Sequence, residues 1–365
     1  MTGDRRRPLH LLCCLAVGAC LTPAVFASRA PADAAPRQTL RAFVGALYQK
    51  RAAALLTGRT AVLRQFYGSG NAAETALEHE NLRTANLHAW LRLHSLRLRA
   101  VWPNLRLVHP EMNRRDRATV YITLSALLSY CDPDGRMSNT FGYTTYHVLV
   151  AERAAGRWRV ASEWYEDPLD ECAVAGDGGA GLAAPLLAAA PRETSAARLA
   201  AGRYADRYCG VAVPGCADGR YNRRYRDFTF DGGDCANFVS QVLTDREAGG
   251  LDTDWSWFSG GGGGTVAWTK ADALVHHLLD TGRATLLYRL PIDALMARTD
   301  LSRLRPGDVV AYQHHGAIRH VAVVTCRDWR GWPLVDSHTV DRYHCPFDLG
   351  WSGATVFWLL QTALP

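Results

Sequence analysis

Two consecutive glycines lead into a segment with helical spacing, and a cysteine stands at the junction. The segment 232–241 is Gly-Gly-Asp-Cys-Ala-Asn-Phe-Val-Ser-Gln, which predicts that Cys235 lies in the first turn of a helix with an apolar stripe of Phe238, Val239 and Val242. Backbone N–H groups and the helix dipole favour an anion there, which biases a cysteine toward the thiolate. Half of a structural disulfide is the alternative role for Cys235.

Two later strand-like segments carry histidines. His320 opens the first, and the second contains Asp336 and His338, which share one strand face because they are two residues apart. A thiolate, a base and a residue that orients the base are the parts needed for nucleophilic acyl transfer. We therefore expect His320 to act as the base for Cys235. His338 is the expected orienting residue, with Asp336 as the alternative.

These motifs resemble an amidase domain of bacterial secreted proteins, which is related to papain-like cell-wall peptidases and cysteine/histidine-dependent amidohydrolases. The resemblance covers about 197–351 and includes segment 232–241, Ala248-Gly249-Gly250, Pro306-Gly307-Asp308, the His320 strand and His338-Thr339-Val340-Asp341. It implies a papain-like α+β domain in which a helix bearing the cysteine packs on an antiparallel sheet bearing the histidine. It implies no cofactor.

The resemblance also implies residues around the nucleophile. Tyr225, ten residues before Cys235, stands where related peptidases place a tyrosine of the oxyanion hole, with packing as the alternative. The glycine run 260–264 departs from the family pattern, and because five glycines are costly to hold in one conformation it is expected to form a mobile flap. Four side chains are expected to line a substrate groove, with core burial as the alternative for the tryptophans: Asn237, Trp255, Trp257 and Trp268.

The first half of the chain carries no recognisable chemistry. Helical spacing over 38–56 and 72–91 precedes strand patterns at 96–102, 119–128, 144–151 and 157–165, which predicts helices packed on one face of a four-stranded meander. A nuclear-transport-factor-like or cystatin-like fold would fit this order. The expected organisation is a signal peptide (1–27), a disordered segment (28–38), an α+β module (39–170), an Ala/Gly-rich linker (171–192) and the amidase domain (193–365).

The N-terminal segment predicts export. Three arginines precede a short apolar run, and small residues follow it, so cleavage is expected after Ala27; lipidation at Cys20 is the alternative. Removing residues 1–27 takes away three arginines and one aspartate, so the net charge falls from +6 to +4. This balance suits an anionic cell wall and is too low for a nucleic-acid binder. No later segment predicts a membrane span.

The number of cysteines and the spacing of histidines predict disulfides but no metal site. Seven cysteines remain after cleavage at Ala27, and if Cys235 stays free the other six can pair in an oxidising compartment. The expected pairs are Cys209–Cys216, Cys326–Cys345 and Cys131–Cys172. The histidines lack close metal-ligand spacing, so no metal site is predicted.

Together these features predict an exported cysteine-dependent amide hydrolase with a secreted or cell-envelope location. By analogy, its substrate would be a peptidoglycan-type amide of the cell envelope. An acyltransferase with the same chemistry is one alternative. A non-catalytic cell-wall-binding protein is another, because a fold does not fix a function.

Overall fold

The computed structural model describes residues 34–172, 194–214, 216, 219–298 and 300–365. The predicted signal peptide 1–27, with Cys20 and Ala27, lies outside the described residues, as do residues 173–192 of the predicted linker. Helices and antiparallel strands make up the described chain, so the α+β class is confirmed. Residues 34–38, expected to be disordered, belong to the first helix. No helix among the described residues is long and apolar enough to cross a membrane.

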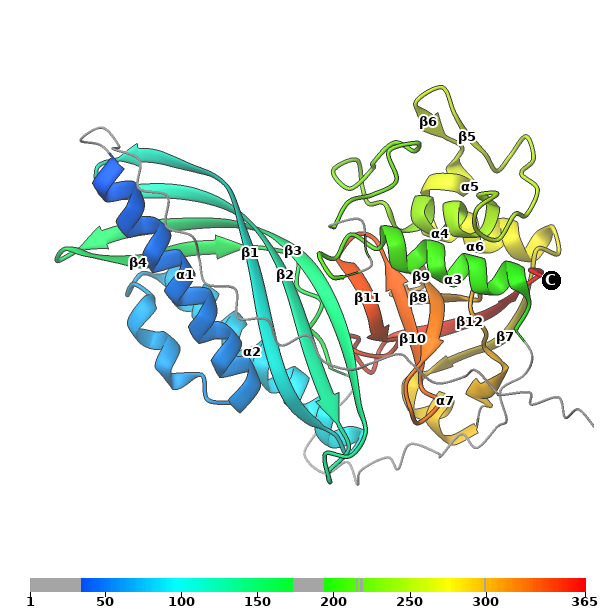
Figure 1. The fold of residues 1–365 in the computed structure, drawn as a ribbon, viewed down its shortest axis with the longest axis horizontal. Helices are drawn as coiled ribbons and strands as arrows, with labels where there is room; N and C mark the ends of the chain where they lie inside the picture. Colours follow the sequence, from blue (N-terminus) through cyan, green and yellow to red (C-terminus); the bar gives the residue numbers. More distant parts are fainter. Residues whose placement is uncertain (1–33, 173–193, 215, 217–218, 299) are drawn as a thin grey trace, which may run out of the picture.

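The N-terminal half has the predicted order of two helices followed by a meander. Its elements are α1 (Ala34–Thr57), the 3-10 helix η1 (Ala61–Phe66), α2 (Asn71–Leu93), β1 (Arg97–Arg114), β2 (Arg117–Cys131), β3 (Ser138–Ala154) and β4 (Arg157–Trp164). Ala155 and Gly156 close the β3–β4 hairpin with φ angles of 48° and 78°. Figure 1 shows α1 and α2 packed along one side of these curved strands. Leu47, Trp90 and Ile122 lie in the core between them.

The C-terminal half has helices on both sides of its strands (Figure 1). Its helices are α3 (Ala196–Tyr208), α4 (Cys235–Thr244), α5 (Val266–Thr269), α6 (Ala271–Asp280), α7 (Ile292–Arg298) and η2 (Leu301–Arg303). Its strands are β5 (Ser259–Gly260), β6 (Gly263–Gly264), β7 (Ala284–Pro291), β8 (Val309–His314), β9 (Ala317–Arg327), β10 (Pro333–Ser337), β11 (Asp341–Pro346) and β12 (Val356–Thr362).

Two separate cores cover the two faces of this C-terminal sheet. Val321 and Val323 of β9 pack with α3, α4 and α6 on one face. Ala322 and Val324 pack with α7 on the opposite face. This alternation along one strand is what a sheet buried on both sides requires.

One sheet runs through both halves of the chain. Its main path is β1-β2-β3-β11-β10-β9-β8-β12-β7, and β4 pairs with β3. The junction is the pairing of β3 with β11, where Arg342 lies opposite Tyr143. Beside it, the Asp348 carboxylate accepts hydrogen bonds from the indole N–H groups of Trp90 and Trp332, both at 2.8 Å. The two halves are therefore joined by backbone pairing and by buried polar contacts.

Candidate active site

Cys235 is the first residue of α4, as the sequence predicts. Gly232 and Gly233, with φ angles of 99° and 105°, make the turn that delivers it. Cys235 is only 7% exposed. Burial raises the pKa of Cys235 to about 11, although hydrogen bonds from the backbone N–H groups of Val321 and Ala236 act to lower it. The expected fall of the Cys235 pKa below that of a free thiol is therefore absent in this geometry.

His338 lies beside the residue that precedes the cysteine. Its Nδ1 is 2.5 Å from Oδ2 of Asp234, and its Nε2 is 2.6 Å from the backbone carbonyl oxygen of Tyr208. The ring is stacked between Tyr221 and Phe238, with centroid distances of 3.6 and 4.0 Å. These contacts hold the imidazole in a single orientation.

The hydrogen-bond partners of His338 favour one protonation state. A carboxylate and a carbonyl oxygen accept hydrogen bonds, so these partners favour an imidazolium, in which both ring nitrogens donate. Burial alone would lower the pKa of His338, but the hydrogen bond and charge of Asp234 raise it above the usual value. Asp234 is itself fixed, since its Oδ1 accepts from the Phe228 N–H and from the Asn237 amide, both at 2.8 Å.

The structure does not bring His320 to Cys235. Its register partner is Tyr312 on β8, and its ring lies near Tyr312 and Trp351, with centroid distances of 5.6 and 5.7 Å. Tyr312 belongs to the core on the α7 face, whereas Cys235 belongs to the core on the α4 face. Burial, aided by Arg342, lowers the pKa of His320 to about 3.

A β-bulge explains why His320 is on the far face. Gln313 pairs with Ile318 and Tyr312 pairs with His320, so Arg319 is an extra residue on β9. In a strand without a bulge, regular alternation over Ile318, Arg319 and His320 would place His320 on the same face as Ile318, which packs in the core with Cys235. One inserted residue reverses the face of the next side chain.

Asp336 lies on β10, whereas His338 lies in the turn that follows this strand, and Asp336 does not contact His320. It is completely buried toward α3, and its Oδ1 accepts from the backbone N–H of His344 at 2.7 Å. The two candidates for the third member thus lie on the helix-covered side of β10. No pattern in the sequence indicated that His320 would lie on the other side.

Tyr225 does not approach the nucleophile. Its hydroxyl donates to Oδ2 of Asp245 at 3.0 Å, and its ring stacks on Trp268. Asp245 follows the last turn of α4, ten residues after Cys235, which is roughly 15 Å along a helix. The predicted oxyanion role is therefore wrong for this geometry, and the packing alternative applies.

Most of the predicted groove residues belong to the core. Trp257 and Trp268 are 0% and 2% exposed, and their indole N–H groups donate to Ser240 and Asn237. Trp255, by contrast, is 89% exposed and is the member of the set that is open to solvent.

The glycine run between these tryptophans has a defined shape. It forms the β5–β6 hairpin, with Gly261 and Gly262 at φ angles of 62° and 79° in the turn. Positive φ at both central positions is the requirement of a tight hairpin turn, and glycine meets it without strain. The predicted motion of this segment as a flap remains a prediction.

None of the three predicted disulfides is formed. Cys209 and Cys216 are adjacent, with their sulfur atoms 2.6 Å apart, but both are free thiols. Cys131 is also a free thiol, at the end of β2, so its bridge to Cys172 is absent. That pairing rested on elimination alone.

The order of the strands excludes the predicted disulfide between Cys326 and Cys345. Cys326 on β9 lies opposite Leu334 of β10, while Cys345 on β11 lies opposite Val335 of β10. With β10 between them, the two cysteines are two strand spacings apart, or about 9.5 Å. A disulfide requires Cα atoms within about 7 Å.

Sequence reasoning missed Asp234 as the partner of His338. A carboxylate directly before the nucleophile is the signal that could have indicated an imidazole partner. It also missed Asp206 and His344, whose side chains lie 2.8 Å apart near Asp336. No spacing in the sequence connects α3 with β11.

Over the whole chain, the protein shows little similarity to known proteins. No curated protein matches it. Three solved structures match at low TM-scores: a hexachlorocyclohexane dehydrochlorinase (LinA) Type2, LinA itself, and hexachlorocyclohexane dehydrochlorinase LinA-type3 from Novosphingobium barchaimii LL02. Their identities are 17%, 18% and 17%, and their TM-scores are 0.24, 0.25 and 0.23. They cover 36%, 37% and 36% of this chain and 91%, 91% and 89% of their own.

The C-terminal half has a match at the family level. The matched segment, 195–360, is slightly less than half of the 365 residues. It contains Cys235, Asp234, His320 and His338. This segment matches the family described as "Putative amidase domain", which points to hydrolysis of amides.

Proposed function

We propose that this protein is an exported cysteine-dependent amide hydrolase that acts on peptidoglycan-type amides of the cell envelope. The observation that carries the proposal is the position of Cys235 at the start of α4, inside the segment that matches the amidase family. Hydrogen bonds from the backbone N–H groups of Val321 and Ala236 to the thiol favour the thiolate. The envelope substrate and export rest on the sequence, through the basic N-terminal leader and the net charge after its removal.

We assign the proton transfers to His338 and its orientation to Asp234. Cysteine hydrolases attack as a thiolate and protonate the leaving amine from an imidazolium, and the contacts of His338 favour the imidazolium. Attack by Cys235 would form a thioester and release the amine, which takes a proton from His338. Water would then add to the thioester, give its proton back to His338 and release the acid. Asp234 would hold Nδ1 throughout, as the carboxylate does in a catalytic triad.

This mechanism requires a local movement. Among the described residues, no imidazole is hydrogen-bonded to the Cys235 thiol, and Nε2 of His338 is bound to the Tyr208 carbonyl. Nε2 would have to leave that carbonyl to reach the leaving group. Catalytic hydrogen bonds commonly tighten only when substrate is bound.

The second candidate is a non-catalytic wall-binding protein. Two observations favour it: burial holds the pKa of Cys235 at about 11, and the β-bulge turns His320 away from the thiol. A buried neutral thiol without a base is inert. The acyltransferase alternative uses the same residues as the hydrolase and differs only in the acceptor.

Digestion of purified peptidoglycan, with mass analysis of the soluble products, tests the proposal. We expect the wild type to release fragments, Cys235→Ala to release none, and Cys131→Ala, a change at another buried free thiol, to behave as wild type. His338→Gln should lose at least about 100-fold in kcat, the usual cost of losing an acid–base group, while His320→Gln stays close to wild type.

The outcomes separate the candidates. If His320→Gln loses activity and His338→Gln retains it, His320 is the catalytic base and the assignment to His338 is wrong. Products joined to an added amine, in excess of hydrolysis products, would indicate the transferase. Wild-type binding to peptidoglycan without any cleavage, unchanged in Cys235→Ala, would support the wall-binding protein.

A further inference from the structure

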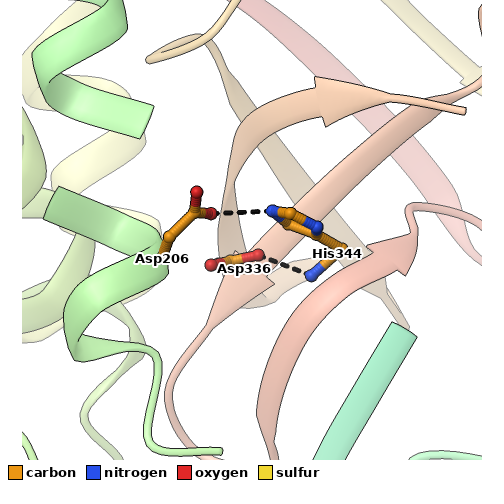
Figure 2. Close-up of side chains that lie close together, drawn as sticks. All are labelled: Asp206, Asp336 and His344. Carbon is orange, nitrogen blue, oxygen red and sulfur yellow. Dashed lines mark hydrogen bonds and ion pairs between the residues drawn. The ribbon is translucent and has the colours of Figure 1, made fainter. Parts of the chain in front are cut away.

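Three metal-ligating side chains from three separate elements converge next to α3. Asp206 comes from α3, Asp336 from β10 and His344 from β11, and Figure 2 shows them facing one another. One ligand atom of each lies within 4.8 Å of the ligand atoms of the other two. Nε2 of His344 is 2.8 Å from Oδ1 of Asp206, while the backbone N–H of His344 donates to Oδ1 of Asp336.

The second oxygen of Asp336 is the atom that this cluster leaves unsatisfied. Asp336 is 0% exposed, and its Oδ2 has no hydrogen-bond partner among the described residues. A buried carboxylate oxygen without a partner is costly, and buried charges are ordinarily paired or bound to a metal.

Thiols lie beside the same three residues. The sulfur atoms of Cys209 and Cys216 are 2.6 Å apart. The Cys216 sulfur is not among the ligand atoms that lie within 4.8 Å of one another. Cys216 also contacts the backbone carbonyl of Asp206 at 2.5 Å. Carboxylate oxygen, imidazole nitrogen and thiolate sulfur are the donor types that zinc binds in tetrahedral sites.

The cluster can be reached from solvent. A cavity of about 640 Å³ is lined by Asp206, Cys216 and Tyr343, so an ion could enter from that side. The side chains of Asp206 and His344 are 36% and 20% exposed. The site is thus closed on the Asp336 side and open on the Asp206 side.

We propose that Asp206, Asp336 and His344 bind a zinc ion, and that the Cys216 sulfur moves toward them to become the fourth ligand. The ion would take its bonds from Oδ1 of Asp206, Oδ2 of Asp336 and Nε2 of His344. Four protein ligands make a structural site, so its role is to fasten α3 and the loop after it to β10 and β11. The inference is independent of any activity at Cys235, and a histidine-based search of the sequence misses it because two of the ligands are aspartates.

Zinc content and affinity test the site directly. The full chain, produced without a polyhistidine tag and kept reduced, should hold about one zinc per molecule by elemental analysis. After removal of the metal, titration with zinc chloride against a chromophoric chelator should give tight binding by the wild type. Asp336→Asn and His344→Gln should each bind zinc more than about 100-fold more weakly. Mutation of residues that only orient metal ligands already lowers metal affinity by about 10- to 100-fold.

A control variant shows whether loss of any histidine beside an aspartate weakens zinc binding. His276 lies 3.6 Å from Asp272 in an exposed pair that has the same residue types but no third ligand, so His276→Gln should bind zinc as the wild type does. Circular dichroism shows whether each variant is folded. Zinc should raise the melting temperature of the metal-free wild type and leave that of Asp336→Asn unchanged.

Cobalt substitution tests the thiol. Bound cobalt should show a thiolate charge-transfer band that disappears in Cys216→Ser; a wild type without that band would overturn the fourth ligand. A reduced wild type that binds no zinc would overturn the whole site. Folded Asp336→Asn with wild-type zinc affinity would do the same.

Discussion

Replacing Asp234 with asparagine should remove the counter-charge of a buried imidazolium. Asp234 and His338 are both buried, and their side chains meet at 2.5 Å. Breaking a buried pair by removing one partner costs about 3–5 kcal/mol, because the remaining charge has lost its compensation. That is a large part of the roughly 5–15 kcal/mol that stabilises a typical folded protein. Asparagine keeps the size of the side chain, so packing against His338 should change little.

The loss of folding stability in Asp234→Asn should depend on pH, and it should be larger in mild acid than in alkali. Because the folded-state pKa of His338 is raised above 6.5, its contribution is fully present below that pH and is lost as the pH rises through the folded pKa. Across that window the wild-type stability attributable to His338 falls by about 1.4 kcal/mol per pH unit. In Asp234→Asn, burial is no longer offset by the carboxylate, so the pKa of His338 should drop. The difference in the free energy of unfolding between wild type and Asp234→Asn should therefore be greatest in mild acid and smallest in alkali.

Urea unfolding at several pH values, followed by circular dichroism, measures this difference. The control is Asp272→Asn, which removes the carboxylate of an exposed pair with His276 and should cost at most about 1 kcal/mol at any pH. An Asp234→Asn cost that stays constant with pH, or that grows in alkali, would refute the assignment of His338 as an imidazolium.

Three further predictions follow from burial and backbone geometry. Iodoacetamide should label Cys235 far more slowly at pH 7 than in unfolded protein, because burial raises its pKa to about 11; fast labelling would mean that a base reaches the thiol in solution. Trp257→Ala should lower the free energy of unfolding by about 3–5 kcal/mol, whereas Trp255→Ala should stay within about 0.5 kcal/mol; equal losses in chemical denaturation would contradict their burial. Gly350→Ala should destabilise the junction between the halves, because its Cβ would come 1.8 Å from the Pro168 carbonyl oxygen at a φ of 81°; a melting temperature equal to wild type would contradict this contact.

Periodicity in the sequence was enough to place the main elements. The spacing of apolar residues gave α1, α2 and the β1–β4 meander in the right order, and it placed Cys235 at the first position of α4. The strands β7 and β11 were missed. The predicted boundary between two domains gave no hint that β3 and β11 would pair and carry one sheet across it. Strand pairing between distant segments depends on long-range packing, which periodicity does not report.

What the sequence determined by itself is the arrangement within single elements. It showed that Cys235 begins a helix and that Asp336 lies on a strand, because a helix turn and a strand alternation are local properties of the backbone. Only the tertiary structure decided what each face meets. A one-residue bulge at Arg319 sends His320 to the opposite core, and the docking of α3 on β10 and β11 brings Asp206 to Asp336. Which element covers a given face is settled by packing among segments far apart in the chain, and no local pattern encodes it.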